Sequence, residues 1–168
     1  LLLLSNHQSH LDPPLVGLAC DRQLSYMARE TLFHFAPLAW FIRSVNGFPI
    51  DREGSGLSGV RETLKRLKQG GAVVIFPEGT RSRDGQVAAL KAGFSALARR
   101  SKVPLVPVGI DGAFDAWPRR RLFPLPAPVA IVFGQPLEPG EVAGFSDREL
   151  VAEVERRIRL CHRSAQRL

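Results

Sequence analysis

Short apolar runs without polar alternation are the feature that most constrains this fold. Ala72 to Phe76 and Leu105 to Ile110 are rich in Val and Ile and contain no charged residue. Runs of this kind are typical of strands that are buried on both faces. Leu1 to Leu4 is a third apolar run, and it leads directly into a polar loop.

Segments with helical spacing lie between these runs. Hydrophobic residues recur three or four positions apart in segments 57–67, 90–97 and 150–158. The last segment is preceded by a capping box, formed by Ser146 and Glu149. The alternation predicts an α/β fold, with a central sheet flanked by helices on both faces, in a single domain over residues 1–168. The order of the strands cannot be predicted from the sequence.

The remaining elements are shorter. They are a helix at Pro14–Cys20, a strand at Leu24–Ala28, a helix from Thr31 to about Ser44, an extended piece ending at Ile50, a long loop at Trp117–Pro128 and a strand at Val129–Phe133.

The net charge of +7 indicates an anionic partner, such as nucleic acid, an anionic membrane surface or a phosphorylated substrate. No nucleic-acid recognition motif is visible, so nucleic acid is not expected. Two cysteines, Cys20 and Cys161, are too few for a disulfide scaffold and favour a cytosolic compartment. No apolar run approaches the roughly 18 to 20 residues that span a bilayer. The chain lacks an initiator Met, which suggests that an upstream segment is missing.

The polar loop after Leu4 contains His7 and, five residues later, Asp12. Proline follows Asp12 and favours extended geometry in the preceding residue, so Asp12 is expected at a helix N-cap or in the loop. A carboxylate there can hold one imidazole nitrogen and leave the other as a base. Such a pair can deprotonate a hydroxyl without a covalent intermediate. An isolated His and Asp at this spacing also occur by chance, so the other loops decide the interpretation.

A second polar loop, Phe76 to Ser82, follows a buried strand. Ligand loops of α/β sheets lie at the carboxyl ends of strands, so both loops are expected to face one crevice. Gly79 allows close backbone approach, and Arg81 offers a planar fork for phosphate oxygens. Arg29 and Arg52 also follow strand candidates. Each arginine alone is typical of a solvated surface, but three at strand ends predict a phosphate site.

Four segments, in this order, resemble motifs of the glycerophosphate acyltransferase superfamily, in particular the bacterial 1-acylglycerol-3-phosphate acyltransferases. In the second motif the family's glycine falls at Asn46, a residue type that tolerates left-handed backbone geometry. The resemblance covers nearly the whole chain. The matching segments are Asn6-His7-x-Ser9-x-x-Asp12, which contains the His-x4-Asp motif, Phe48–Arg52, the unchanged Phe76–Ser82, and Val103–Val108, with Gly93 also at a usual glycine position.

The resemblance implies a mechanism. His7 would be the general base for the free hydroxyl of a lysophosphatidic-acid-like acceptor, and Asp12 would orient the ring. The hydroxyl oxygen would then attack an acyl thioester directly. Val103–Val108 would lie on the acyl-donor side, although this segment also fits a simple buried strand.

The resemblance also implies the acceptor site. Arg52 and Arg81 would bind the phosphate, and Arg29, where relatives often carry Lys, would add charge. Glu78 would bind the glycerol or hold an arginine. Gly79 and Thr80 would shape the loop.

The implied function is 1-acylglycerol-3-phosphate O-acyltransfer, which gives phosphatidic acid for phospholipid biosynthesis. The donor would be an acyl-CoA or acyl carrier protein thioester, a co-substrate, and no resident cofactor is expected. A metal is not expected either: His7, His10 and Asp12 could be ligands, but no further His or Cys lies in a supporting motif. The alternatives are another acceptor, such as glycerol 3-phosphate or another lysolipid, and a non-catalytic lipid-binding domain.

Two segments that contain many hydrophobic residues suggest a location at the cytoplasmic face of the membrane. The protein would be peripheral or anchored by an absent upstream segment. The stretch from Leu32 to Ile42 is apolar around most of its expected helix, which is typical of a buried helix or of one in lipid. Pro37 is expected to kink this helix. Trp117 to Phe123 mixes arginines with aromatic residues. It could contact anionic lipid, coenzyme A or an acidic carrier protein, or be a solvated basic loop.

Overall fold

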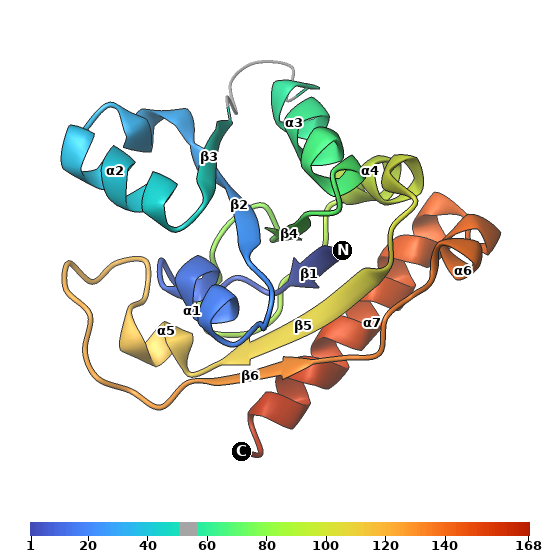
Figure 1. Ribbon diagram of the computed structural model, residues 1–168. Helices are drawn as coiled ribbons and strands as arrows, with labels where there is room; N and C mark the ends of the chain where they lie inside the picture. Colours follow the sequence, from blue (N-terminus) through green and yellow to red (C-terminus); the bar gives the residue numbers. More distant parts are fainter. Residues whose placement is uncertain (51–56) are drawn as a thin grey trace.

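A computed structural model describes residues 1–50 and 57–168 of the protein, and Figure 1 shows its elements. The strands are β1 (Leu2–Ser5), β2 (Leu24–Arg29), β3 (Gly47–Ile50), β4 (Ala72–Ile75), β5 (Leu105–Asp111) and β6 (Ala130–Phe133). The helices are α1 (Asp12–Leu18), the 3-10 helix η1 (Glu30–Phe33), α2 (Ala36–Ser44), α3 (Leu57–Lys68), α4 (Gly93–Ser101), α5 (Ala113–Ala116), α6 (Pro139–Gly144) and α7 (Asp147–Ala165).

Among the described residues, the strands form one sheet in the order β3-β2-β4-β1-β5-β6. All neighbouring pairs are parallel except β5 and β6, which are antiparallel. The apolar β1 lies in the interior of this sheet, between β4 and β5, and all four of its residues are buried. This position explains why the run of leucines shows no polar alternation.

Helices cover both faces of the sheet, as the sequence predicts. Leu2 and Leu4 pack with residues of α3, α4 and α7 on one face, whereas Leu3 packs with residues of α1 and α5 on the other. Figure 1 shows the two groups of helices on opposite sides of the strands. The α/β prediction is therefore confirmed, and the parallel strands bring the ends of β1, β2 and β4 to one edge.

The C-terminal helix α7 packs directly on β5. Its predicted capping box is present, because Ser146 Oγ accepts a hydrogen bond from Glu149 N and the Glu149 side chain accepts one from Ser146 N. The strand contributes Gly109 at the closest approach, where a Cβ atom would overlap the backbone of Cys161 and His162. Glycine is thus required here for helix and strand to touch.

The structure corrects several predicted boundaries. The single helix expected from Thr31 to about Ser44 is two pieces, because η1 ends at Phe33 and α2 begins at Ala36. Pro37 does not kink a helix but lies in the first turn of α2, where its missing N–H removes no intrahelical bond. The short helices α5 and α6 were not predicted, and segment 117–128 is a loop as expected.

The Asn46–Gly47 turn leads into the second motif with left-handed backbone geometry at Asn46. Asn46 has φ 65°, in the left-handed region, so asparagine replaces the family's glycine without loss of the turn. A Cβ at Gly47 would lie 2.9 Å from the carbonyl oxygen of Ile42, so the next position must be glycine. Asp51 and Arg52, which complete this motif, lie outside the described residues.

Candidate active site

The two polar loops predicted to face one crevice lie side by side. Ser82 N donates a hydrogen bond to the carbonyl oxygen of His7 at 2.7 Å. In return, His7 N donates to Glu78 Oε1 at 3.0 Å. These bonds join the loop after β1 to the loop after β4, so the predicted proximity of the two loops is confirmed.

His7 and Asp12 form a close pair. His7 Nδ1 lies 2.6 Å from Asp12 Oδ2, and Asp12 is fully buried. The same oxygen accepts hydrogen bonds from Gln8 N at 2.6 Å and Ser9 N at 2.8 Å. A carboxylate only accepts, so Nδ1 carries the ring proton in this contact, and Nε2 of the neutral ring is a proton acceptor.

Asp12 differs from its predicted position. It is the first residue of α1, whose N-cap is Leu11, and that cap makes no side-chain hydrogen bond. The Asp12 carboxylate turns back to the loop instead of capping the helix. Its Oδ2 atom therefore accepts from His7 and the two residues that follow it, whereas buried Oδ1 has no hydrogen-bond partner among the described residues.

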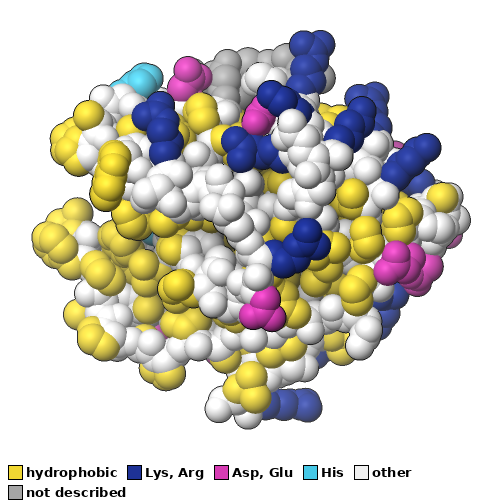
Figure 2. Space-filling view, viewed as in Figure 1, with side chains coloured by type: hydrophobic (Ala, Val, Ile, Leu, Met, Phe, Trp, Pro, Cys, Tyr) yellow, Lys and Arg dark blue, Asp and Glu magenta, His cyan; other side chains and the backbone are white. Residues whose placement is uncertain are grey.

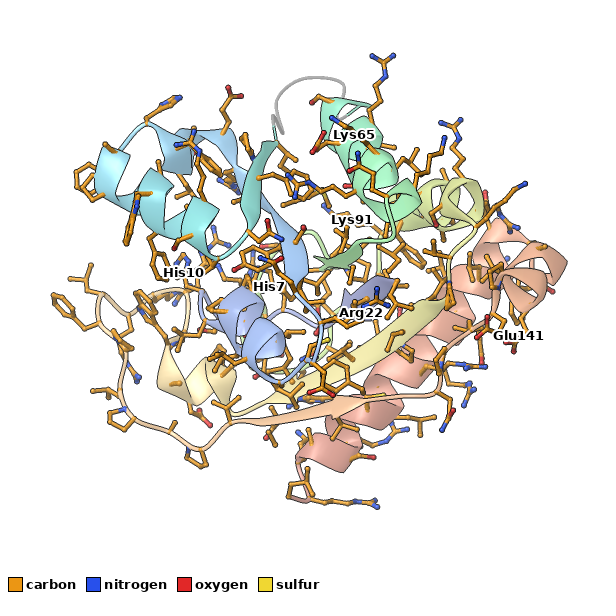
Figure 3. All side chains as sticks on the ribbon, in the orientation of Figure 1. His7, His10, Arg22, Lys65, Lys91 and Glu141 are labelled. Atoms are coloured by element: carbon orange, nitrogen blue, oxygen red, sulfur yellow. The ribbon has the colours of Figure 1, made fainter. Side chains whose placement is uncertain are left out.

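The rest of the loop is held from three directions. The His7 ring stacks on Phe76, with centroids 4.1 Å apart and planes 19° apart. Asn6 forms two bonds with the backbone of Ile110 on β5, at 2.8 and 2.7 Å. Ser9 Oγ donates to the carbonyl oxygen of Trp117 at 2.8 Å. Figure 3 places His7 beyond the tip of β1, between α1 and β2 in the view.

Glu78 lies beneath this loop. It is 2% exposed, Oε1 receives the His7 amide, and buried Oε2 has no hydrogen-bond partner among the described residues. Burial raises the pKa of Glu78 to about 7. Its observed contact is with the His7 backbone, and its predicted role as an acceptor ligand stays a prediction.

Arg81 interacts electrostatically with Arg29 and Arg119, and we call these three arginines the cationic cluster. One terminal nitrogen, Nη1, is buried and has no hydrogen-bond partner in the described part of the chain. Burial lowers the pKa of Arg81, and repulsion from Arg119 and Arg29 lowers it further, while Asp12 opposes the shift. Arg29, Arg81 and Arg119 therefore act on a common region, which suits an anion next to the His7–Asp12 pair. Sequence reasoning placed Arg119 in a basic loop and did not assign it to the site.

Gly79 and Thr80 form the outer turn of this loop. Gly79 has φ 71°, and a Cβ there would lie 3.0 Å from Lys91 Nζ. Lys91 N also donates to the carbonyl oxygen of Pro77 at 2.9 Å, which explains why α4 begins at Gly93 and not near Leu90. Lys91 was not predicted as a site residue, and Thr80 is exposed.

His10 lies beside the pair but does not join it. Its ring tilts against Trp117 with centroids 5.2 Å apart, and Figure 3 shows it toward α2 and the loop after α5. Partial burial lowers the pKa of His10, as do the charges of Arg81 and His7. The described part of the chain contains no group of three or more His, Cys, Asp or Glu side chains that could hold a metal ion.

Exposed hydrophobic side chains extend from both sides of the site, and we call them the apolar rim. One part follows Arg29 along η1 and α2, and the other belongs to the loop after Trp117. In the second part Phe123 is 76% exposed. In the first part Trp40 is 73% exposed, and Leu32, Phe35 and Phe41 are exposed too, so the buried interpretation of the Leu32–Ile42 stretch is wrong for most of its large hydrophobic side chains. Figure 2 shows the hydrophobic surface over α2 and over this loop. The rim comprises Leu32, Phe35, Trp40, Phe41, Leu122, Phe123 and Leu125.

A surface pocket of about 470 Å³ lies within the first part of the rim, between η1 and α2. Phe33, Trp40 and Arg43 are among its lining residues, and no predicted site residue lines it. Within residues 1–50 and 57–168, no helix is both long enough and apolar enough to cross a bilayer.

Comparison with known proteins gives concordant matches. A family model described as acyltransferase matches residues 1–111. The chain is 33% identical over 147 residues to the 1-acyl-sn-glycerol-3-phosphate acyltransferase of Bacillus subtilis, a match that covers 87% of this chain and 71% of that protein. It is 30% identical over 113 residues to the protein of the same name from Streptococcus pneumoniae, covering 66% and 41% of the two chains.

A solved structure is similar over nearly the whole chain. It is the crystal structure of PlsC, the 1-acyl-sn-glycerophosphate (LPA) acyltransferase of Thermotoga maritima, with a TM-score of 0.80 and 32% sequence identity. The match covers 99% of this chain and 65% of the PlsC chain. The chain therefore spans 41% to 71% of the length of these three relatives.

Proposed function

The chain belongs to the acyltransferase family, and we propose that it transfers a fatty acyl group from an acyl thioester to the sn-2 hydroxyl of lysophosphatidic acid, giving phosphatidic acid. The observation that carries this proposal is the 2.6 Å contact between His7 Nδ1 and Asp12 Oδ2 beside the cationic cluster. The names of the relatives from Bacillus subtilis and Thermotoga maritima support the choice of acceptor.

In the proposed reaction, His7 acts as the general base. Nε2 takes the proton from the acceptor hydroxyl, and Asp12 stabilises the imidazolium that forms. The hydroxyl oxygen attacks the thioester carbonyl carbon, the carbon–sulfur bond breaks, and the departing thiolate takes the proton back from His7. General-base assistance of this kind contributes roughly a hundred- to ten-thousand-fold in rate.

Binding of the phosphate is assigned to the arginines. Arg81 offers a buried guanidinium nitrogen that lacks a protein partner among the described residues, and a phosphate oxygen would supply one. Arg29 adds charge from the end of β2, and Arg52 is proposed to bind the phosphate together with Arg81. Gly79 and Thr80 let the loop close on the acceptor, and Glu78 holds the loop or meets the glycerol.

The donor is proposed to be acyl-CoA or an acyl carrier protein, with no resident cofactor or metal. Arg119, Arg120 and Arg121 are exposed and would suit the phosphates of coenzyme A or an acidic carrier. A thiol-release assay with each donor distinguishes the two.

The apolar rim is proposed to lie on an anionic membrane at its cytoplasmic face. Its aromatic side chains flank the site that would receive a lipid, and the arginines of the loop after α5 would meet lipid phosphates. Sedimentation with phosphatidylglycerol vesicles should carry the protein down, and a Trp40→Ser/Phe123→Ser variant should bind several-fold less. Leu168→Ser, which changes an exposed hydrophobic residue outside the rim, is the control and should bind as the wild type does.

The decisive experiment measures thiol release with a panel of acceptors. We expect turnover with lysophosphatidic acid that exceeds turnover with glycerol 3-phosphate or other lysolipids, and none from a folded His7→Ala variant. A folded His7→Ala protein with wild-type turnover would refute the mechanism. Lipid binding by the wild type without any turnover would favour a non-catalytic lipid-binding domain.

A further inference from the structure

We infer that His162, on helix α7, is a positioning residue that holds the loop carrying His7 through the side chain of Gln8. This inference rests on the proposed function, because it concerns the base of that reaction. His162 lies far outside residues 1–111, which the family model matches. Its Nε2 atom lies 3.3 Å from Gln8 Nε2, and both side chains are buried.

The amide of Gln8 has a fixed orientation. Its Nε2 donates to the carbonyl oxygen of Gly85 at 2.6 Å, and its Oε1 accepts from Phe114 N at 3.2 Å. A carbonyl oxygen must face a donor and a backbone N–H must face an acceptor, so the two contacts exclude the flipped amide. The second hydrogen of Gln8 Nε2 is therefore available to His162 Nε2, which accepts it when that nitrogen carries no proton.

A second group competes for the same ring nitrogen. Asp111 Oδ1 lies 3.1 Å from His162 Nε2, and this contact needs the nitrogen to be protonated. The Asp111 side chain is 33% exposed, whereas Gln8 is 1% exposed. Water can satisfy the carboxylate but cannot reach the buried amide, so the bond to Gln8 is the one whose loss leaves a group unsatisfied.

Burial also keeps the ring in the form that accepts. It lowers the pKa of His162, and Arg159 and Arg163 lower it further, while Asp111 opposes them. A neutral ring can leave Nε2 without a proton, and an imidazolium cannot.

The close packing of α7 on β5 makes this contact feasible. A Cβ at Gly109 would overlap the backbone of His162 and Cys161, so the helix sits as near to the strand as a polypeptide allows. Two residues further along the strand is Asp111, and between them Ile110 holds Asn6 at 2.8 and 2.7 Å. One short segment of β5 therefore fixes the position of α7 and the position of Asn6, the first residue of the loop.

Displacing Gln8 should displace the base. Gln8 follows His7 directly, and its backbone N–H bonds Asp12 Oδ2 at 2.6 Å, the same oxygen that holds His7 Nδ1. Small errors in the position of a catalytic group reduce turnover strongly, by up to about a hundredfold per ångström. Arg29 lies at the end of β2 and Arg81 lies on the loop after β4, which hydrogen-bonds the His7 loop through Ser82 N, so their substrate contacts should change less than the position of the base.

The test compares three variants in the thiol-release assay with lysophosphatidic acid and acyl-CoA. His162→Leu should lower kcat by about tenfold and leave both KM values within about twofold. His162→Gln can accept from Gln8 and donate to Asp111 at once, so it should restore most of kcat. Cys161→Ala, a change at the neighbouring buried position, should keep wild-type kcat even if it lowers the melting temperature.

A Gln8→Ala/His162→Leu cycle tests whether His162 acts through Gln8. The double variant should have the kcat of Gln8→Ala alone, and multiplicative losses would overturn the inference. Wild-type kcat in folded His162→Leu would also overturn it. If His162→Leu does not fold, His162→Asn, which is too short to reach Gln8, takes its place against His162→Gln.

The failure of the proposed function is recognised separately. If the proposed function is wrong, the wild type has no turnover. The free energy of unfolding is then measured for Gln8→Ala, His162→Leu and the double variant. Coupling between Gln8 and His162 would support the contact, and additive effects would overturn it.

Discussion

Replacing Glu78 with glutamine should change how the stability of this protein depends on pH. Glu78 is 2% exposed, and burial raises its pKa from an ordinary 4.5 to about 7. The Gln variant keeps an oxygen for the His7 amide, which Glu78 Oε1 accepts at 3.0 Å. The substitution removes the ability to ionise and replaces Oε2 by an amide nitrogen, and the second change has the same effect at every pH.

The sign of the effect follows from proton binding. Between pH 4.5 and about 7 the folded protein holds a proton on Glu78 that the unfolded chain has released. The free energy of unfolding of the wild type, relative to the Gln variant, therefore falls as pH rises through this window. It is constant above pH 7. Raising the pKa of Glu78 from 4.5 to about 7 lowers the free energy of unfolding above pH 7 by about 3 kcal/mol in total.

Urea unfolding from pH 5 to pH 8 measures this difference, because other titrating groups cancel between the two proteins. Glu153→Gln is the control, since hydrogen bonds and charge from Arg156 and Arg157 lower the pKa of Glu153 to about 2. Because the pKa of Glu153 is lowered, the stability that its ionised side chain contributes is present above pH 4.5 and is lost only in acid, the opposite sign to Glu78. Within the measured range the Glu153 difference should therefore be flat.

If the difference in the free energy of unfolding between the wild type and Glu78→Gln does not change between pH 5 and pH 7, the pKa of Glu78 is not raised by burial. A constant difference would mean that the carboxylate is ionised throughout, because the amides of His7 and Ala88 and the charge of Arg159, which lower its pKa, outweigh the effect of burial.

Two further changes test the second loop. Arg81→Ala should raise the KM for the acceptor by at least tenfold, with Arg83→Ala, an exposed neighbour, as the control; a loss of affinity for the acyl donor alone would contradict the assignment. Gly79→Ala should lower the free energy of unfolding by about 1–2 kcal/mol, because φ is 71° and the new methyl would crowd Lys91. Gly93→Ala, in a helix with open space around its Cβ position, should be neutral or slightly stabilising, and equal losses at both glycines would contradict this explanation.

The class of fold and the types of side chain in the two loops could be predicted from the sequence alone. Leu1 to Leu4 and Ala72 to Phe76 lack polar alternation because both faces of their strands are covered. His7 and Asp12 are five residues apart, so the chain can fold one side chain back on the other within a single loop. Local patterns of this kind depend on near neighbours, and the sequence contains those neighbours.

The residues that contact the His7 loop from other parts of the chain are known only from the tertiary structure. The order of the strands places β1 between β4 and β5, and this brings Glu78 under His7 and Ile110 against Asn6. No local pattern marks Gln8 as a partner of His162, which is 154 residues away. Contacts at such separations come from packing α7 on β5, and they depend on the shape of the whole sheet. The sequence thus identifies the proposed base and its carboxylate, and the fold shows which residues hold them in place.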